Sequence, residues 1–87
     1  MQLSVCLSSE AERFFAHLGK TNTKLYLIVK SHLLKLPETY KQDTFLKGPA
    51  KGLRRHRVGD YRIIYRVIHN QLLIYVIEIG HRREIYE

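Results

Sequence analysis

The sequence has few of the residues that would place it in a specialised structural class. It contains one cysteine, two prolines and no tryptophan among 87 residues. A lone cysteine, Cys6, cannot form a disulfide within the chain, which excludes a disulfide-stabilised scaffold and favours a reducing, cytoplasmic location. The longest apolar run, residues 72–77, is strand-sized and far below the ~20 residues that span a membrane. No secretory leader is recognised either, so we expect no membrane association.

Acidic residues are scarce as well. The chain has 15 Lys and Arg residues against 8 Asp and Glu residues, a formal net charge of +7. The excess lies mostly in residues 47–87, which carry nine basic and four acidic residues. A basic half on a small domain predicts an acidic partner, either nucleic acid or an acidic protein, and charge alone does not choose between them. No Cys/His spacing indicates a metal site, and we expect neither metal nor cofactor.

The first half of the chain is predicted to form a strand and a helical hairpin. Apolar residues alternate over residues 2–7, as in a strand with one buried side. Ser9 and Glu12 have the spacing of a capping box, which predicts the start of a short helix. Gly19 is expected to end that helix, since glycine is the residue favoured just beyond a helix C-terminus.

A second helix is predicted over residues 25–36, where apolar residues keep the helical period and lysines lie opposite. Asn22 or Thr23 is expected to cap its start, and Pro37 is expected to end it. Only a few residues connect the two helices, which predicts an antiparallel pair packed on a sheet.

The second half is predicted to be strands. Residues 39–52 have the composition of a loop, and Gly59-Asp60 is a tight-turn signal between two strand candidates. The nearly continuous apolar run at residues 72–79 predicts a strand covered on both faces, with Gly80 at its end. The predicted fold is α+β in one domain, residues 1–87: a two-helix hairpin on a curved, largely antiparallel sheet of four to five strands, in the order β-α-α-β-β-β. The predicted strands are residues 2–7, 53–58, 61–68 and 72–79, with a short last strand at 83–86.

Two segments closely resemble the RelE/ParE superfamily of type II toxin–antitoxin toxins. They are VGDYRIIYRV at residues 58–67 and IGHRREIY at residues 79–86, and LKG at residues 46–48 also fits. The superfamily contains two activities. RelE-like toxins cleave messenger RNA in the ribosomal A site, and ParE-like toxins inhibit DNA gyrase without cleaving nucleic acid.

The resemblance implies a set of site residues. RelE-like toxins use basic residues on the sheet and a tyrosine near the C-terminus, and the matching residues here are Arg62, Arg82 and Tyr86. Counting back from Arg62 without gaps, Leu53 and Arg55 occupy the positions where RelE-like toxins often carry two lysines. Arginine stays charged and cannot serve as a general base, so the proton-accepting role is open.

Histidine is the chemically preferred proton acceptor, because it titrates near neutral pH. The candidates are His81, His56 and Lys51, and His81 is favoured because it is adjacent to Arg82. Further basic residues are expected to contact the RNA backbone or an antitoxin, namely Lys51, Arg54, Arg55 and Arg57. We expect the segment from Arg54 to Arg66 to line one open surface.

Other residues have plainer interpretations. Arg66 and, less favourably, Arg62 could pair with Glu78 across neighbouring strands. Tyr61 and Tyr65 share a strand face with apolar residues, which predicts a place in the core. The remaining histidines, His17, His32 and His69, are expected at the surface or on the flank of a helix, and Cys6 is expected to be a structural thiol.

The sequence therefore favours a ribosome-dependent messenger RNA endoribonuclease held inactive by a cognate antitoxin. The alternatives are a gyrase inhibitor on the same fold and a catalytically weakened, antitoxin-binding co-repressor. The resemblance implies the ribosome and messenger RNA as partners, together with a toxin–antitoxin hetero-oligomer that binds operator DNA.

Overall fold

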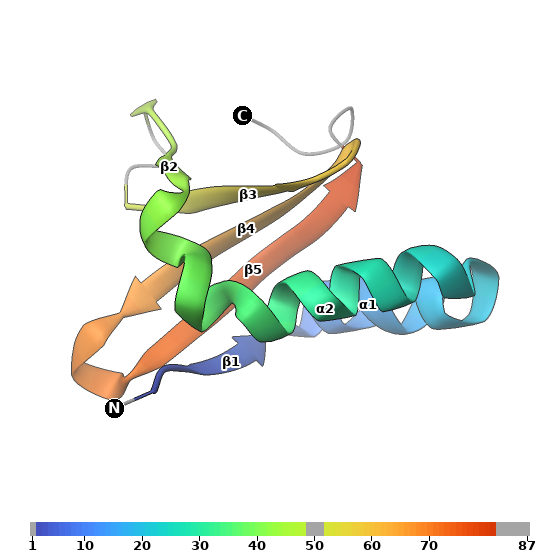
Figure 1. Ribbon diagram of the computed structural model, residues 1–87, viewed down its shortest axis with the longest axis horizontal. Helices are drawn as coiled ribbons and strands as arrows, with labels where there is room; N and C mark the ends of the chain where they lie inside the picture. The colour runs from blue at the N-terminus through green and yellow to red at the C-terminus, as the bar shows by residue number, and fades with distance from the viewer. Residues whose placement is uncertain (1, 49–51, 82–87) are drawn as a thin grey trace.

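A two-helix hairpin packs against one face of a five-stranded mixed sheet (Figure 1). The computed structural model describes residues 2–48 and 52–81. The strand order in the sheet is β1-β5-β4-β3-β2, with β1 parallel to β5 and every other neighbouring pair antiparallel. The predicted α+β fold is confirmed. The elements are β1 (Ser4–Leu7), α1 (Ser9–Thr21), α2 (Thr23–Thr39), the 3-10 turn η1 (Tyr40–Gln42), β2 (Thr44–Phe45), β3 (Arg54–Val58), β4 (Tyr61–Ile68), the 3-10 turn η3 (His69–Gln71) and β5 (Leu73–His81).

The core lies between the hairpin and the sheet. Ile63 and Tyr65 of β4 point to this side and are fully buried, as are Val76 of β5 and Val29 and Leu36 of α2. Each fully buried apolar side chain of this size stabilises the fold by roughly 1.5–3 kcal/mol. The predicted core position of Tyr65 is confirmed, and Tyr61 packs at the edge of the same cluster.

The first helix begins differently from the prediction. Its N-cap is Ser8, whose Oγ accepts a hydrogen bond from the backbone N–H of Ala11 at 3.0 Å. The same hydroxyl donates to the carbonyl oxygen of Ile77 at 2.6 Å and so ties the helix start to β5. The predicted capping box at Ser9 is therefore wrong, because Ser9 is already the first helical residue.

Replacing Ser8 with alanine should lower the free energy of unfolding by about 1–2 kcal/mol, because the helix loses its cap and Ile77 loses a hydrogen-bond donor. Chemical denaturation measures this change. Ser9→Ala is the matched control and should shift stability by no more than ~0.5 kcal/mol. Equal effects of the two substitutions would show that the cap is not at Ser8.

Both predicted helix ends are also wrong. Gly19 lies inside α1, where a Cβ atom would come within 3.3 Å of the Tyr26 ring, so the glycine serves helix packing. Asn22 ends α1 through its N–H, which donates to the Leu18 carbonyl, and its side chain caps α2 as predicted. Pro37 lies within the last turn of α2, which continues to Thr39.

The sheet differs from the prediction at three points. The segment predicted to be a loop contains β2, which pairs with the start of β3. Gly80 does not end β5, which continues to His81, and β5 is not covered on both faces, since Tyr75 is 36% exposed. The predicted strand at residues 83–86 lies outside the described residues. No helix in the described ranges has both the length and the apolar character that a membrane span requires.

Candidate nucleic-acid interface

The pleat of β3 divides its basic residues between the two faces of the sheet. Arg54 and His56 stand opposite the core residues Tyr65 and Ile63 of β4, so they point toward the helices. Arg55 and Arg57 point to the other face, because side chains alternate along a strand. The prediction that Arg54 to Arg66 line one open surface is therefore wrong for half of these positions.

The face away from the helices carries the guanidinium groups of Arg55, Arg57, Arg62 and Arg66. Arg57 and Arg62 are direct cross-strand neighbours. Like charges at opposed positions destabilise a sheet, and an anion between them would relieve that repulsion. Arg62 is only 6% exposed and makes a further interaction within the protein, contrary to the expected open position. Arg66 is exposed and stands opposite Tyr75, whereas Glu78 stands opposite Ile64.

A small apolar cluster covers the middle of this face. Leu46 and Ile64 are buried together, and Leu53 packs against them. Two shallow depressions flank Arg55 at the edge of β3. One of about 240 Å³ is lined by Gln42, Asp43, Thr44, Arg55, His56 and Arg57, and one of about 190 Å³ is lined by Thr44, Phe45, Leu46, Lys47 and Arg55. Arg55 therefore borders both hollows in which a phosphate could lie.

The structure does not bring His81 together with Arg62. His81 stands opposite Tyr61 in the register and meets its ring edge-on at 5.3 Å, whereas Arg62 stands opposite Gly80. Tyr61 packs at the core side of the sheet, so His81 and Arg62 occupy opposite faces. The other expected site residues, Lys51, Arg82 and Tyr86, lie outside the described residues.

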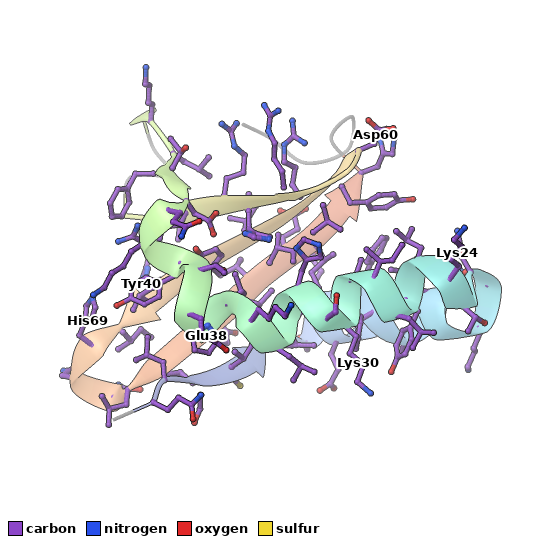
Figure 2. The ribbon with its side chains drawn as sticks, in the orientation of Figure 1. Lys24, Lys30, Glu38, Tyr40, Asp60 and His69 are labelled. Carbon is purple, nitrogen blue, oxygen red and sulfur yellow. The ribbon has the colours of Figure 1, made fainter. Side chains whose placement is uncertain are left out.

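Arg54 is held inside the protein rather than offered to a ligand. Its guanidinium lies 4.0 Å from the ring centroid of Phe45 and 5.4 Å from that of Tyr40. One of its terminal nitrogens donates to the carbonyl oxygens of Tyr40 and Asp43 at 3.2 and 3.4 Å. These contacts join η1 and β2 to the sheet, at the end of the fold where Tyr40 and His69 also meet (Figure 2).

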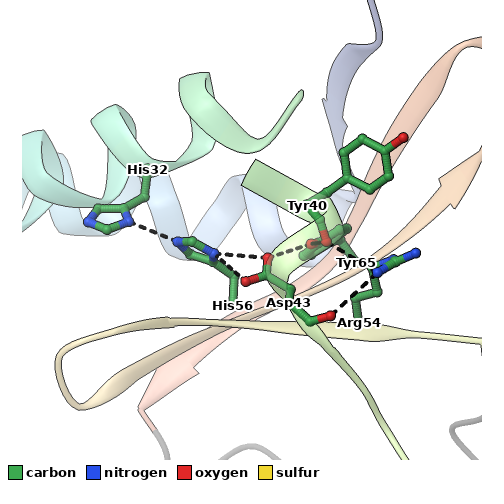
Figure 3. A network of polar contacts seen from close by, with 6 residues as sticks. All are labelled: His32, Tyr40, Asp43, Arg54, His56 and Tyr65. Atoms are coloured by element: carbon green, nitrogen blue, oxygen red, sulfur yellow. Dashed lines mark hydrogen bonds and ion pairs between the residues drawn. The ribbon is translucent and has the colours of Figure 1, made fainter. Parts of the chain in front are cut away.

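A polar network that the sequence prediction missed lies beside Arg54 (Figure 3). The carboxylate of Asp43 accepts from Nδ1 of His56 at 2.9 and 3.0 Å and also from the hydroxyl of Tyr65. Nε2 of His56 lies 2.8 Å from Nδ1 of His32 on α2. The chain of contacts thus connects α2, β3, β4 and the segment before β2. His32 is a half-buried residue of α2, and its contact with His56 was not predicted from the sequence.

The proton assignment of the network follows from Asp43. An ionised carboxylate only accepts, so Nδ1 of His56 donates to Asp43, and one of the two facing nitrogens of His56 and His32 donates to the other. Burial lowers the pKa of His32, and the neighbouring His56 and Lys35 lower it further. Burial and the bond to Asp43 raise the pKa of Tyr65, which stays protonated. No sequence spacing predicts the network, because its members come from separate elements.

The free energy of unfolding should fall as the pH is lowered from about 7 toward 5. The pKa of His32 is lower in the folded state than its ordinary value of 6.5, so the unfolded chain takes up the proton first. This stabilisation is present above pH 6.5 and is lost as the pH falls through the folded-state pKa. Denaturant unfolding of wild type and His32→Gln at several pH values measures it.

The role of His32 is measured by the difference between wild type and His32→Gln in how the free energy of unfolding changes with pH. Burial and the charge of Glu10 raise the pKa of Glu78. The folded state therefore takes up this proton first, which stabilises both proteins at lower pH and opposes the effect of His32. His32→Gln should show a flatter pH dependence between 5 and 7. Identical slopes for wild type and variant would contradict the assigned role of His32.

Comparison with solved structures shows which proteins share this fold. Among solved structures, a RelBE toxin–antitoxin complex from Mycobacterium tuberculosis superposes with a TM-score of 0.82 at 19% identity, over 94% of this chain and 100% of the other. The E. coli RelBE complex superposes with a TM-score of 0.71 at 19% identity, over 93% of this chain and 96% of the other. A chromosomal ParDE system from P. aeruginosa superposes with a TM-score of 0.68 at 13% identity, over 92% of this chain and 96% of the other. At these identities the similarity establishes the fold alone.

Sequence comparison identifies the family. A search of curated proteins finds no match. The family model described as the ParE toxin of a type II toxin–antitoxin system, parDE, matches residues 7–86, which is nearly the whole chain. This confirms the predicted membership of the RelE/ParE superfamily, and the chain belongs to the ParE toxin family of type II toxin–antitoxin toxins.

Proposed function

We propose that this toxin is a ribosome-dependent endoribonuclease that cleaves messenger RNA. The observation that carries the proposal is the Arg57–Arg62 pair, two arginines at directly opposed positions of neighbouring strands on the face away from the helices. Arg55 and Arg66 extend the same basic face from the pair in the direction away from the turn between β3 and β4. Guanidinium is suited to phosphate because its donors form a rigid fork that binds two oxygens at once.

The proposed reaction is a transesterification at phosphorus. The ribose 2′-oxygen loses its proton and bonds to the adjacent phosphorus, and the bond from phosphorus to the 5′-oxygen breaks as that oxygen gains a proton. Negative charge grows on the phosphate oxygens in between, where fixed positive groups have their largest effect. We assign that role to Arg62 and Arg82, and base stacking to Tyr86.

The described residues alter two of the expected roles. Arg54 is enclosed by Phe45 and Tyr40, so we assign it to holding β2 and η1 rather than to RNA. His81 faces away from Arg62, so it does not serve as a proton acceptor for a phosphate at the Arg57–Arg62 pair without rearrangement. Arg55, Arg57 and Lys51 remain assigned to the RNA backbone.

Gyrase inhibition is the second candidate function. The family model that the chain matches is named for the ParE toxin, and it favours this alternative. In that case the basic sheet face would contact protein, and no bond in nucleic acid would be broken by the toxin itself. A weakened co-repressor that only binds its antitoxin is a third candidate.

We further propose a cognate antitoxin with an acidic segment that covers the basic face. RelBE structures from M. tuberculosis and E. coli are complexes of toxin with antitoxin, and they share this fold. Exposed charge pairs are screened within ~10 Å at 0.1 M salt, so the affinity should fall as salt rises. An affinity that does not change with salt would indicate a mainly apolar interface.

Two reactions with purified toxin test the proposed activity. In the first, ribosomes stalled on a defined message are incubated with the toxin, and primer extension maps the new 5′ ends of the message. In the second, gyrase supercoils a relaxed plasmid with and without the toxin. We expect cuts in the ribosome-bound message and unchanged supercoiling. Intact message together with blocked supercoiling would assign the chain to gyrase inhibition.

A further inference from the structure

A row of three residues crosses the open face of the sheet at the end away from the Arg57–Arg62 pair. Cys6 of β1 stands opposite Tyr75 of β5, and Tyr75 stands opposite Arg66 of β4. Residues that are paired across strands project from the same face, so Tyr75 stands between Cys6 and Arg66 on this face. Cys6 and Arg66 are exposed, and Tyr75 is 36% exposed.

This tyrosine differs from the other tyrosine near the middle of the sheet. Tyr65 is fully buried, and its hydroxyl donates to Asp43 in the polar network. Tyr75 lies on the opposite face, where the helices do not cover it. An aromatic ring left partly exposed on a sheet, with a guanidinium beside it, presents a flat apolar surface next to a positive charge.

We propose that Tyr75 and Arg66 form a stacking site for an unpaired base of single-stranded RNA. The proposal rests on the proposed nuclease function and adds a second contact point for the same substrate. Sheets bind single-stranded RNA by stacking bases on exposed aromatic side chains, while basic groups hold the phosphates. Here Tyr75 takes the base and Arg66 the adjoining phosphate.

The position of the site fits a strand of RNA that runs along β4. Arg66 follows Arg62 by four residues on the same strand and the same face, a distance of about 13 Å at ~3.3 Å per residue. The arginines on this face give it the charge that a polyanion needs, and Glu78 beside Ile64 is the carboxylate among them. Charge fits both RNA and an acidic protein segment, and the exposed side chain of Tyr75 favours RNA, because an acidic segment needs no base-sized aromatic surface.

Fluorescence anisotropy with a dye-labelled, uncleavable 2′-O-methyl oligoribonucleotide of eight residues tests the site without ribosomes. Base stacking contributes ~1–3 kcal/mol per base, so Tyr75→Ala should weaken binding by about 5- to 150-fold. Tyr75→Phe keeps the ring and should stay within about 3-fold of wild type. Tyr75→Leu keeps an apolar residue in the strand but lacks the ring, and it should bind as weakly as Tyr75→Ala.

Controls separate stacking from folding. Leu27→Ala removes an exposed apolar side chain from α2 and should leave the affinity unchanged. Cys6, the single cysteine of the chain, allows a second test, because a bulky maleimide there would stand beside the ring and should reduce binding. If Tyr75→Leu unfolds at the same temperature as wild type and still binds RNA as well, the site is wrong.

The outcome for this site is independent of the outcome for the proposed function. If the toxin cleaves ribosome-bound message but its RNA affinity does not change when Tyr75 is replaced, the stacking site is wrong and the proposed nuclease function stands. Tyr75-dependent RNA binding by a toxin that cuts no message would support the site and overturn the nuclease. An effect of Tyr75→Ala on antitoxin affinity but not on RNA affinity would replace the stacking site with a protein contact.

Discussion

Replacing Arg62 with alanine should reduce cleavage of ribosome-bound message by at least about 10²-fold, as the loss of other preorganised charge stabilisers does. The guanidinium opposes that of Arg57 and, in the proposed reaction, stabilises charge that grows on the phosphate in the transition state. Binding to ribosomes should fall far less, because Arg55, Arg57 and Arg66 still contact the RNA backbone. Single-turnover cleavage and ribosome co-sedimentation measure the two effects separately.

Because Arg62 is buried, a second substitution is needed to separate its effect on activity from its effect on stability. The side chain is 6% exposed, so its removal can lower stability as well as activity. Arg62→Lys keeps the charge but lacks the fork that binds two phosphate oxygens, and it should also lose most of the activity. Arg13→Ala on α1 is the matched control, since it removes an exposed arginine from the other layer. Full cleavage by a folded Arg62→Lys or Arg62→Ala variant would remove Arg62 from the site.

Replacing Asp43 with alanine should destabilise the protein by about 3 kcal/mol, because two largely buried donors lose their acceptor at roughly 1–3 kcal/mol each. The change leaves the Tyr65 hydroxyl and Nδ1 of His56 without their acceptor, in a region where water has little access. It also frees the segment that connects α2 to β2. Urea denaturation at pH 7 measures the loss.

Two controls bear on the Asp43 result. Asp43→Asn keeps an oxygen acceptor of the same size without the charge, so its cost should be smaller than that of alanine. Glu38→Ala removes an exposed carboxylate from α2 and should change stability by less than ~0.5 kcal/mol. A cost for Asp43→Ala no greater than that for Glu38→Ala would show that the network does not hold the fold together.

The strands were predictable where local signals agreed. β4 was predicted at residues 61–68, and the structure has it at Tyr61–Ile68. The period-2 pattern and the Gly59-Asp60 turn both point to these bounds, and Gly59 has the positive φ of 61° that such a turn requires. The fold class followed from the order of the predicted elements, and the superfamily followed from the family motif in the same region.

Features set by contacts between distant segments were not predictable. The spacing between Ser9 and Glu12 favoured Ser9 as the cap, and the choice of Ser8 depends on Ile77 in β5. β2 is only two residues long, and its pairing with β3 determines it rather than its composition. The inward position of Arg54 depends on the pleat together with the rings of Phe45 and Tyr40.

The most direct measurement of the central claim is the fate of RNA and DNA after brief expression of the toxin in growing cells. Sequencing of RNA 5′ ends reports cuts in messages, and end-labelling of chromosomal DNA reports gyrase-dependent breaks. The proposed function predicts early cuts that keep the codon phase within translated regions, with intact DNA, and loss of these cuts in Arg62→Lys. DNA breaks that disappear in gyrase-resistant cells, with uncut messages, would contradict it.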